Sequence, residues 1–305
     1  MNGLAGHVED YLRLRRALGF KMRFHGQVLP SLAAYLEAAG SATVTAELAV
    51  AWAGLPQGVH PVVWSHRLGA ARGFARYLKT VDPAAEVPPD RVWPTVAPRR
   101  RPVIFADGDI TRLLQAARAL NPPLRAATFE AMLGLIAATG MRLGEAIGLD
   151  RADTDLGDGM LTIRGAKSGR DRLVPLHPTA AIALAGYAGR RDQLCPDPAT
   201  SRFFVSSVGT PVHERLADQA FAQLTSRLGL RTAERQPRIH DLRHTFAVRQ
   251  LLAWHRDGAD VNAKMPVLSA YLGHVSPAGT YWYLTAVPEL MELVAARLTR
   301  GGRSD

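Results

Sequence analysis

Residues 240–283 read HDLRHTFAVRQLLAWHRDGADVNAKMPVLSAYLGHVSPAGTYWY, a stretch in which histidine, arginine and tyrosine side chains gather. Its first part predicts a helix, because apolar residues recur at spacings of three and four and Gly258 supplies a C-terminal stop. On that helix His240, Arg243 and His244 fall at i, i+3 and i+4, so they share one face. Their many hydrogen-bond donors suit a phosphate or a carboxylate. A solvated polar face or a capped helix start explains these three residues equally well.

The second part of the stretch brings another histidine and a cluster of tyrosines. An apolar run at 267–272 ends in Gly273 and His274, and Tyr281 and Tyr283 follow after a turn. Tyrosine is a weak nucleophile at its ordinary pKa of about 10. It therefore needs cations around the reacting group and a means of losing its proton. Arginine and histidine side chains beside a tyrosine provide both.

This constellation resembles the catalytic domain of the tyrosine recombinases, also called the phage integrase family. Their signature is an H-x-x-R on a helix, then L-G-H, then a tyrosine nine residues later; His240, Arg243, residues 272–274 and Tyr283 match it in order. Upstream, ATGMRLGE at 138–145 resembles the segment with the family's first arginine. KSGRDRLVPL at 167–176 resembles its lysine-bearing hairpin. Five separated elements in the right order argue against a chance match.

The resemblance implies a DNA strand transferase that uses no metal, no ATP and no other cofactor. A tyrosine would attack a DNA phosphate, giving a 3′-phosphotyrosyl link and a free 5′-hydroxyl, and a hydroxyl of another strand would then rejoin the DNA. Two arginines would hold the non-bridging oxygens, a lysine would protonate the leaving 5′-oxygen, and a histidine would be the base or the hydrogen-bond partner of the nucleophile. The residues at the family's catalytic positions are Arg142, Lys167, His240, Arg243, His274 and Tyr283.

Neighbouring residues compete for, or support, these roles. For the nucleophile, family spacing selects Tyr283 over Tyr271 and Tyr281. For the proton donor, the match to the family's hairpin favours Lys167 over Arg170 and Arg172. A lysine at a hairpin tip is, however, most often simply solvated. Two supporting residues are expected. They are Glu145, which would orient Arg142 from i+3, and His244, which would pack beside the site.

Composition suggests two domains and favours a polyanionic partner. The chain has 305 residues, a net charge of +10 and a pI near 10.3. It has no apolar run of about twenty residues and no secretory n-region, so neither a membrane span nor a signal peptide is predicted. Cys195 is the only cysteine, which excludes an internal disulfide and a Cys-rich zinc site. We expect a cytoplasmic, nucleoid-associated protein whose partner is double-stranded DNA.

The expected fold is mainly α with a small β-sheet, in two domains. Residues 1–82 read as a helical domain, which the resemblance implies is a SAM-like core-binding domain. Residues 83–102 read as a linker, because their prolines disfavour helix and favour an extended connector. The resemblance makes residues 103–305 the catalytic domain, of the DNA breaking-rejoining type.

The residue pattern of one helix of the first domain, within residues 64–79, predicts a contact with DNA. Beside its apolar stripe it carries a small and basic stripe, in which Ser65 and Gly69 would let a backbone approach closely. Three arginines near the end of the linker can also touch phosphates. A solvated basic face explains both features nearly as well. The candidate DNA-binding residues are Arg72, Arg76, Lys79, Arg99, Arg100 and Arg101.

Local patterns set further expectations for the second domain. Asp107 or Asp109 would cap its first helix, and Gly140 would end the helix at 124–139. Strands are expected at 160–163 and 173–176, with a third at 203–205. The remaining expectations are helices at 178–191, 214–228 and 288–298 and a long loop at 255–264.

Three other functions compete with site-specific recombination or integration. A type IB topoisomerase has a similar pocket, and an inactive DNA-binding accessory protein would keep the fold without the chemistry. His240, His244 and His274 could bind zinc in a hydrolase, but Arg243 would repel the ion and no H-E-x-x-H is present. The wording TYWYLT and VPEL resembles recombinases of mobile elements, which implies a role in transposition. The resemblance to the family as a whole implies a homo-tetramer on DNA, with or without companion recombinases. The C-terminal helix could pack on its own domain or, as is frequent in the family, dock in trans on a neighbour.

Overall fold

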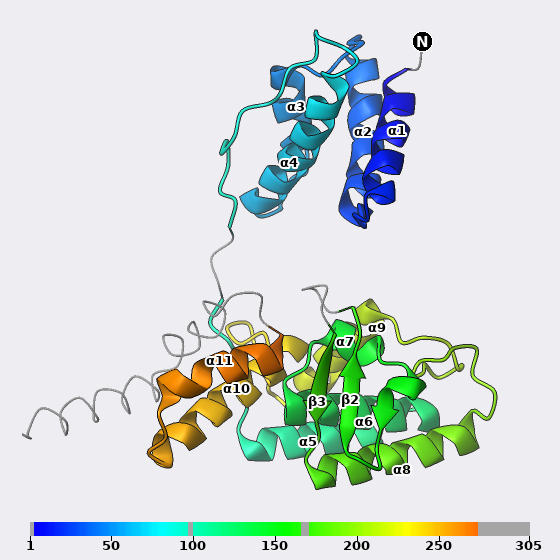
Figure 1. The fold of residues 1–305 in the computed structure, drawn as a ribbon, viewed down its shortest axis with the longest axis vertical. Coiled ribbons are helices and arrows are strands. Elements are labelled where there is room, and N and C mark those ends of the chain that lie inside the picture. Colours follow the sequence, from blue (N-terminus) through cyan, green and yellow to red (C-terminus); the bar gives the residue numbers. More distant parts are fainter. Residues whose placement is uncertain (1–2, 97–99, 166–170, 274–305) are drawn as a thin grey trace, which may run out of the picture. The chain divides into compact units, whose positions relative to one another are not determined.

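The computed structural model describes residues 3–96, 100–165 and 171–273. The chain divides into two units, residues 1–100 and 101–305 (Figure 1). Several residues singled out above lie outside the described residues, as does the helix expected at 288–298. These residues are Arg99, Lys167, Arg170, His274, Tyr281 and Tyr283.

The first unit is built from amphipathic helices whose apolar sides meet in one core. Trp52 and Phe74 are among its fully buried members. Thr45 caps the third helix, because its hydroxyl oxygen accepts a hydrogen bond from the backbone N–H of Leu48 at 3.3 Å. The helices are α1 (Leu4–Ala17), α2 (Arg23–Ala38), α3 (Ala46–Ala53) and α4 (Pro61–Leu78).

The proline-rich stretch differs from the extended connector that its composition predicted. The backbone N–H of Glu86 donates to the carbonyl oxygen of Val44 at 2.8 Å, and the Glu86 carboxylate accepts from the N–H of Ala46 at 2.8 Å. The ring centroid of Trp93 lies 5.7 Å from that of Trp64 on α4. Residues between the prolines thus find partners on the first unit, which holds this part of the stretch against its helices.

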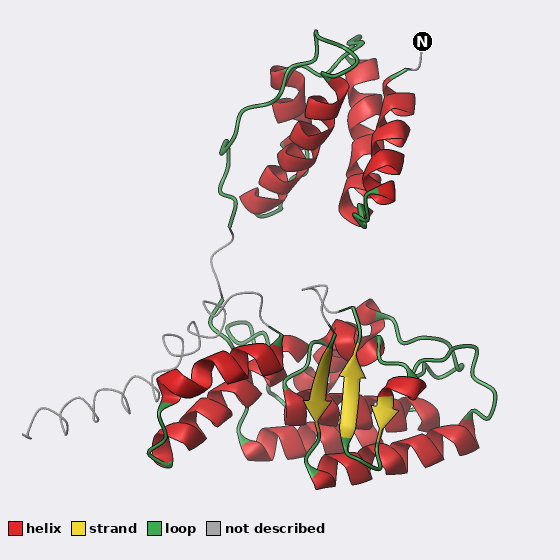
Figure 2. Ribbon diagram, viewed as in Figure 1, coloured by secondary structure: helices red, strands yellow, loops and turns green. Residues whose placement is uncertain are grey.

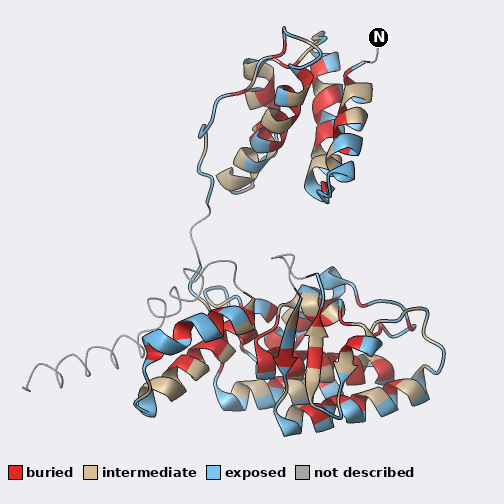
Figure 3. Ribbon diagram, in the orientation of Figure 1, coloured by how far each residue is buried: buried red, intermediate tan, exposed pale blue. Residues whose placement is uncertain are grey.

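The second unit packs helices around α6 (Pro123–Thr139), whose buried residues include Met132, Leu133 and Ile136. Gly140 ends α6 with φ +64°, which confirms the predicted C-terminal stop. Buried and exposed residues alternate along the outer helices, so each keeps one face on the core (Figure 3). The other helices are α5 (Asp107–Arg118), α7 (Leu143–Ile147), α8 (Pro178–Leu194), α9 (Glu214–Arg227), α10 (Ile239–Arg256) and α11 (Val261–Leu272).

A small antiparallel sheet lies beside these helices, with its strands in the order β1-β2-β3 (Figure 2). It consists of β1 (Thr154–Asp155), β2 (Met160–Ile163) and β3 (Arg172–Pro175). In its register Leu161 faces Val174, and Ile163 faces Arg172. The strand expected at 203–205 is wrong, because Val205 forms only an isolated bridge with Pro211. Its phenylalanines are buried without belonging to the sheet.

Two further expectations about helix ends are wrong. The long loop expected at 255–264 is short, because α11 already begins at Val261, where the carboxylate of Asp260 accepts from the N–H of Ala263 at 3.1 Å. The residue that caps α5 is Ala106 rather than an aspartate. Asp109 instead lies inside the first turn, and its carboxylate accepts from the N–H of Ala106 at 3.3 Å. Within the described residues, no helix is long and apolar enough to span a membrane.

Candidate active site

The loop that follows α6 places the first candidate arginine. Gly140 reverses the chain, and Arg142 then precedes α7. Its backbone N–H donates to Glu145 Oε2 at 2.9 Å, and its Nη1 donates to Glu145 Oε1 at 2.8 Å. The predicted pairing of Arg142 with Glu145 is therefore confirmed. The Arg142 side chain is 24% exposed, so a ligand can reach the guanidinium.

The second candidate arginine lies on α10 and is almost fully buried. Nη1 of Arg243 donates to the carbonyl oxygen of Gly140 at 2.8 Å, and Nη2 donates to that of Leu272 at 2.7 Å. These bonds tie α10 to the end of α6 and to the end of α11. The guanidinium is held from several sides, which fixes its orientation before any ligand arrives.

A third arginine, Arg172, joins this cluster, although the sequence indicated it only as a rival to Lys167 at the hairpin. Nη1 and Nη2 of Arg172 donate to the two carboxylate oxygens of Glu145 at 3.0 and 2.7 Å. Its Nε donates to the carbonyl oxygen of Tyr271 at 3.0 Å. The sequence signal for this position was the alternation of side chains along β3. Arg172 lies two residues from the buried Val174, so both side chains are on the inward face of the strand.

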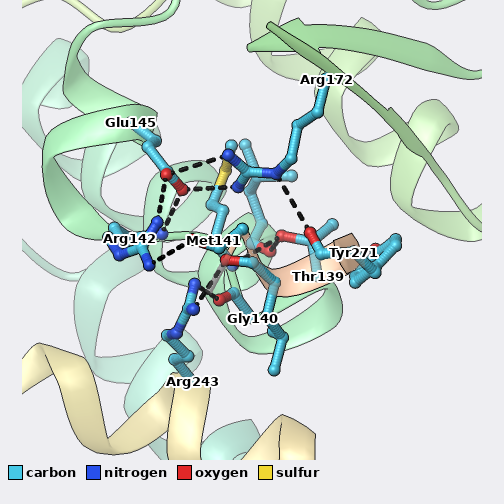
Figure 4. Close-up of polar contacts among 11 residues, drawn as sticks. Thr139, Gly140, Met141, Arg142, Glu145, Arg172, Arg243 and Tyr271 are labelled. Atoms are coloured by element: carbon cyan, nitrogen blue, oxygen red, sulfur yellow. Dashed lines mark hydrogen bonds and ion pairs between the residues drawn. The ribbon is translucent and has the colours of Figure 1, made fainter. Parts of the chain in front are cut away.

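The C-terminal end of α11 is where the three guanidiniums meet (Figure 4). Three consecutive carbonyl oxygens each accept from a different arginine: Tyr271 from Arg172, Leu272 from Arg243 and Gly273 from Arg142, the last at 2.7 Å. The last carbonyls of a helix have no partner within the helix and carry the negative end of its dipole. The helix end therefore attracts cations that three separate elements supply.

One carboxylate serves this cluster of cations. Burial by itself would raise the pKa of Glu145, but the hydrogen bonds from Arg172 and from the Arg142 backbone outweigh burial and lower that pKa to about 2. Glu145 is thus ionised at neutral pH. One negative charge among the guanidiniums of Arg142, Arg172 and Arg243 leaves an excess of positive charge, which favours binding of an anion.

The histidines of α10 lie beside one another, as their spacing predicted. The ring centroids of His240 and His244 are 4.6 Å apart and the rings meet edge to face. His244 is buried, whereas His240 is exposed. Desolvation by nearby protein atoms and the charges of Arg243, Arg238 and Arg142 lower the pKa of His240 to about 4. The lowered pKa leaves the imidazole of His240 neutral at pH 7.

The structure thus gathers one part of the predicted site. Arg142, Glu145 and Arg243 converge, and His240 lies within their electrostatic influence. Lys167, His274 and Tyr283 lie outside the described residues. Among the described residues, no group of three or more His, Cys, Asp or Glu side chains is arranged to hold a metal ion.

The predicted DNA-binding residues of the first unit differ in their surroundings. Arg72 is paired with the carboxylate of Asp90, and its side chain is mostly covered. Arg76 and Lys79 are exposed. Of the three consecutive arginines near the end of the proline-rich stretch, Arg100 and Arg101 are described, and both are exposed.

Known proteins share both the sequence and the fold of this chain. The model of the phage integrase family matches residues 105–289. The integrase/recombinase y4rB of Sinorhizobium fredii is 42% identical over 301 residues, covering 96% of each chain. Tyrosine recombinase XerD of Mycobacterium tuberculosis is 34% identical over 235 residues, which is 75% of this chain and 69% of XerD.

Two solved structures have the same fold. The integrase of transposon Tn1549, in complex with transposon right-end DNA, gives a TM-score of 0.66 at 16% identity over 98% of this chain and 100% of that one. A lambda integrase tetramer bound to a Holliday junction gives a TM-score of 0.59 at 17% identity, over 91% of this chain and 79% of that one. The expected fold class, mainly α with a small β-sheet, is confirmed.

Proposed function

The chain belongs to the phage integrase family of tyrosine recombinases, and from this premise we propose that it breaks and rejoins DNA through Tyr283. Its general function is that of a site-specific DNA recombinase. The finer assignment of residues to steps is our proposal. It rests on the match of Arg142, Lys167, His240 and Tyr283 to the family signature and on the geometry of the described part of the site.

The proposed reaction is a pair of phosphoryl transfers. The phenolic oxygen of Tyr283 attacks a DNA phosphorus, the bond from phosphorus to the 5′-oxygen breaks, and a 3′-phosphotyrosyl link remains. Lys167 gives a proton to the leaving 5′-oxygen. In the second transfer a 5′-hydroxyl of another strand attacks the link and releases the tyrosine. Each step exchanges one phosphoester for another, so no ATP is required.

The observation that carries this proposal is the convergence of Arg142 and Arg243 at the end of α11. Each guanidinium is held by protein acceptors at 2.7 to 2.8 Å. Negative charge on the non-bridging oxygens grows in the transition state, and guanidiniums fixed beforehand stabilise it without reorganisation. They supply the charge that Mg²⁺ supplies in other phosphoryl transfer sites. His274 would add a further donor.

His240 is proposed as the base or hydrogen-bond partner of the nucleophile. A base must be neutral before it accepts a proton, and the lowered pKa of His240 keeps its imidazole neutral at pH 7. A bound phosphate would offset the positive charges of Arg142 and Arg243. The pKa of His240 would then rise, which makes the ring a better acceptor when DNA is in place.

The proposed partners are double-stranded DNA and further copies of this chain. The Tn1549 integrase is bound to transposon DNA and the lambda integrase is a tetramer on a Holliday junction. By analogy we propose a tetramer on DNA, with companion recombinases as an option, and a role in integration or transposition of a mobile element. Such a substrate would place its action at the nucleoid, in the cytoplasm. Arg76, Lys79, Arg100 and Arg101 are the proposed contacts outside the catalytic residues.

A recombination assay tests this function. A target duplex is first selected from a randomised nicked library by covalent capture on the protein, and two copies are cloned into a supercoiled plasmid. We expect recombinant plasmids in buffer that contains a chelator and no ATP. Relaxation of a plasmid without the target would indicate a type IB topoisomerase instead. Binding without any covalent product would indicate an accessory DNA-binding protein.

A further inference from the structure

Arg172 occupies a place in the site that no role above accounts for. It is the first residue of β3, opposite Ile163, on the inward face of a strand otherwise lined by apolar residues. Its side chain is only 13% exposed. A cation is costly to bury unless acceptors match its donors. A buried arginine at this position must therefore be stabilised by the groups that its guanidinium contacts.

The contacts of Arg172 are directional and involve every nitrogen of its guanidinium. Nη1 and Nη2 form a two-pronged ion pair with Glu145, at 3.0 and 2.7 Å, and Nε donates to the carbonyl oxygen of Tyr271 at 3.0 Å. A planar guanidinium suits this paired geometry, whereas a lysine ammonium does not. Arg172 thus joins the β2–β3 hairpin to α7 and to the end of α11.

Glu145 is shared between the two arginines. Its Oε1 accepts from Nη1 of Arg172 and from Nη1 of Arg142, and its Oε2 accepts from Nη2 of Arg172 and from the Arg142 backbone. Both oxygens therefore accept two bonds. Arg142 gives the carboxylate only one bond from its side chain, and its Nη2 turns to the carbonyl oxygen of Gly273.

We propose that Arg172 is a positioning residue of the recombination site, which keeps Arg142 available to the DNA phosphate by occupying Glu145. Without Arg172, the carboxylate would face Arg142 alone. The two would form a two-pronged pair, which would rotate the Arg142 guanidinium and neutralise its charge. The inference rests on the proposed function, because it assigns Arg172 a task in the same reaction.

The packing of Gly273 supports this arrangement independently. Gly273 has φ +66°, and a Cβ at this position would lie 2.9 Å from Nη1 of Arg172 and 3.3 Å from Nη1 of Arg142. The backbone at the end of α11 thus touches both guanidiniums. A side chain here would displace at least one of them, so glycine is required both by the backbone conformation and by the arginines.

The test measures DNA cleavage and DNA affinity separately in the full-length protein. The probe is the selected nicked duplex, and the rate of covalent complex formation is followed in a single turnover at saturating protein. We expect Arg172→Ala to slow cleavage about 10- to 100-fold, while the dissociation constant changes less than about threefold. Arg172→Lys should remain slow, because it restores the charge without the paired geometry.

Arg164→Ala is the matched control. Arg164 directly follows the neighbouring strand β2, but its exposed side chain pairs with Asp153, away from the cluster. We expect the Arg164→Ala variant to cleave DNA at the wild-type rate. Thermal unfolding shows whether each variant is folded. If Arg172→Ala does not fold, Arg172→Gln replaces it, because glutamine keeps part of the side chain and one contact with the carboxylate.

Combining the Arg172 and Glu145 substitutions decides the mechanism. If Arg172 acts by occupying Glu145, then Arg172→Ala should slow cleavage less than about threefold in a Glu145→Gln background, since the neutral amide no longer captures Arg142. A merely structural role predicts that the two losses multiply. Multiplied losses, or an Arg172→Ala variant that cleaves as fast as wild type, would overturn the inference.

The wild-type reaction separates the two proposals. If the wild-type protein forms no covalent complex with any duplex in the library, the proposed function fails. If it forms the complex and the Arg172 variants do so equally fast, only the role of Arg172 fails. These results differ in the wild-type lane of the same gel.

Discussion

The guanidinium of Arg243 donates a hydrogen bond to the carbonyl oxygen of Gly140 over 2.8 Å, across 103 positions of sequence. This bond joins α10 to the turn that places Arg142. The two arginines that match the recombinase signature are therefore positioned by the same turn. Changes in the turn should affect the stability of the second unit and the geometry of the site together.

Replacing Gly140 by alanine tests that coupling. Gly140 has φ +64°, and a Cβ there would lie 2.6 Å from Cδ1 of Phe246 and 3.0 Å from Cδ2 of Leu272. We expect Gly140→Ala to lower the free energy of unfolding of the second unit by about 2 kcal/mol or more, as measured by urea denaturation. Gly134→Ala in the same helix is the control. Its Cβ would meet only Leu114, at 3.8 Å, so stability should stay equal or rise by up to ~1 kcal/mol.

Glu145 makes stability depend on pH. Its pKa is lowered from an ordinary value of 4.5 to about 2, so the stabilisation is complete above pH 4.5 and is lost as the pH falls toward 2. The shift corresponds to roughly 3 kcal/mol. Glu145→Gln should therefore cost about 3 kcal/mol of unfolding free energy at pH 7 and roughly half of that at pH 3.

Glu130→Gln is the control for that experiment. Glu130 pairs with the exposed Arg118 at 2.6 Å on the surface of the second unit. Exposed pairs stabilise proteins by no more than about 1 kcal/mol. A Glu145→Gln cost that is the same at pH 3 and pH 7 would contradict the ion-pair account of Glu145.

The first unit should contact DNA through Arg76 more than through Arg72. The carboxylate of Asp90 already neutralises Arg72, whereas Arg76 is exposed. In a titration of a random-sequence duplex followed by fluorescence anisotropy, Arg76→Ala should reduce the salt slope of binding by about one. Arg72→Ala should change it less, and Asp90→Ala should strengthen binding. Equal losses for Arg72→Ala and Arg76→Ala would contradict this assignment.

The sequence was most informative where a residue type has a single conformational or chemical reason to be present. Gly140 predicted the end of α6 because glycine adopts positive φ without strain, and the i+3 spacing predicted the pair of Arg142 and Glu145. The signature of His240 and Arg243 indicated the family from the order of residues alone. These signals are local, or they depend on the order of motifs along the chain.

Expectations failed where tertiary contacts decided the outcome. The loop expected at 255–264 ends early, because α11 begins at Val261 and buries one apolar face even though Pro266 lies inside the helix. The apolar run at 203–205 looked like a strand, but burial alone does not require a strand partner. The place of Arg172 in the arginine cluster was not predicted, because its partners, Glu145 and Tyr271, lie 27 and 99 positions away in the sequence.

The central claim, that a tyrosine near the carboxyl end forms a covalent bond to DNA, is tested most directly by covalent trapping. Wild-type protein, Tyr283→Phe and Tyr281→Phe are each incubated with the selected nicked duplex and separated on a denaturing gel. We predict that the wild type and Tyr281→Phe yield a protein–DNA adduct and that Tyr283→Phe yields none. An adduct that persists in Tyr283→Phe and disappears in Tyr281→Phe would contradict the assignment.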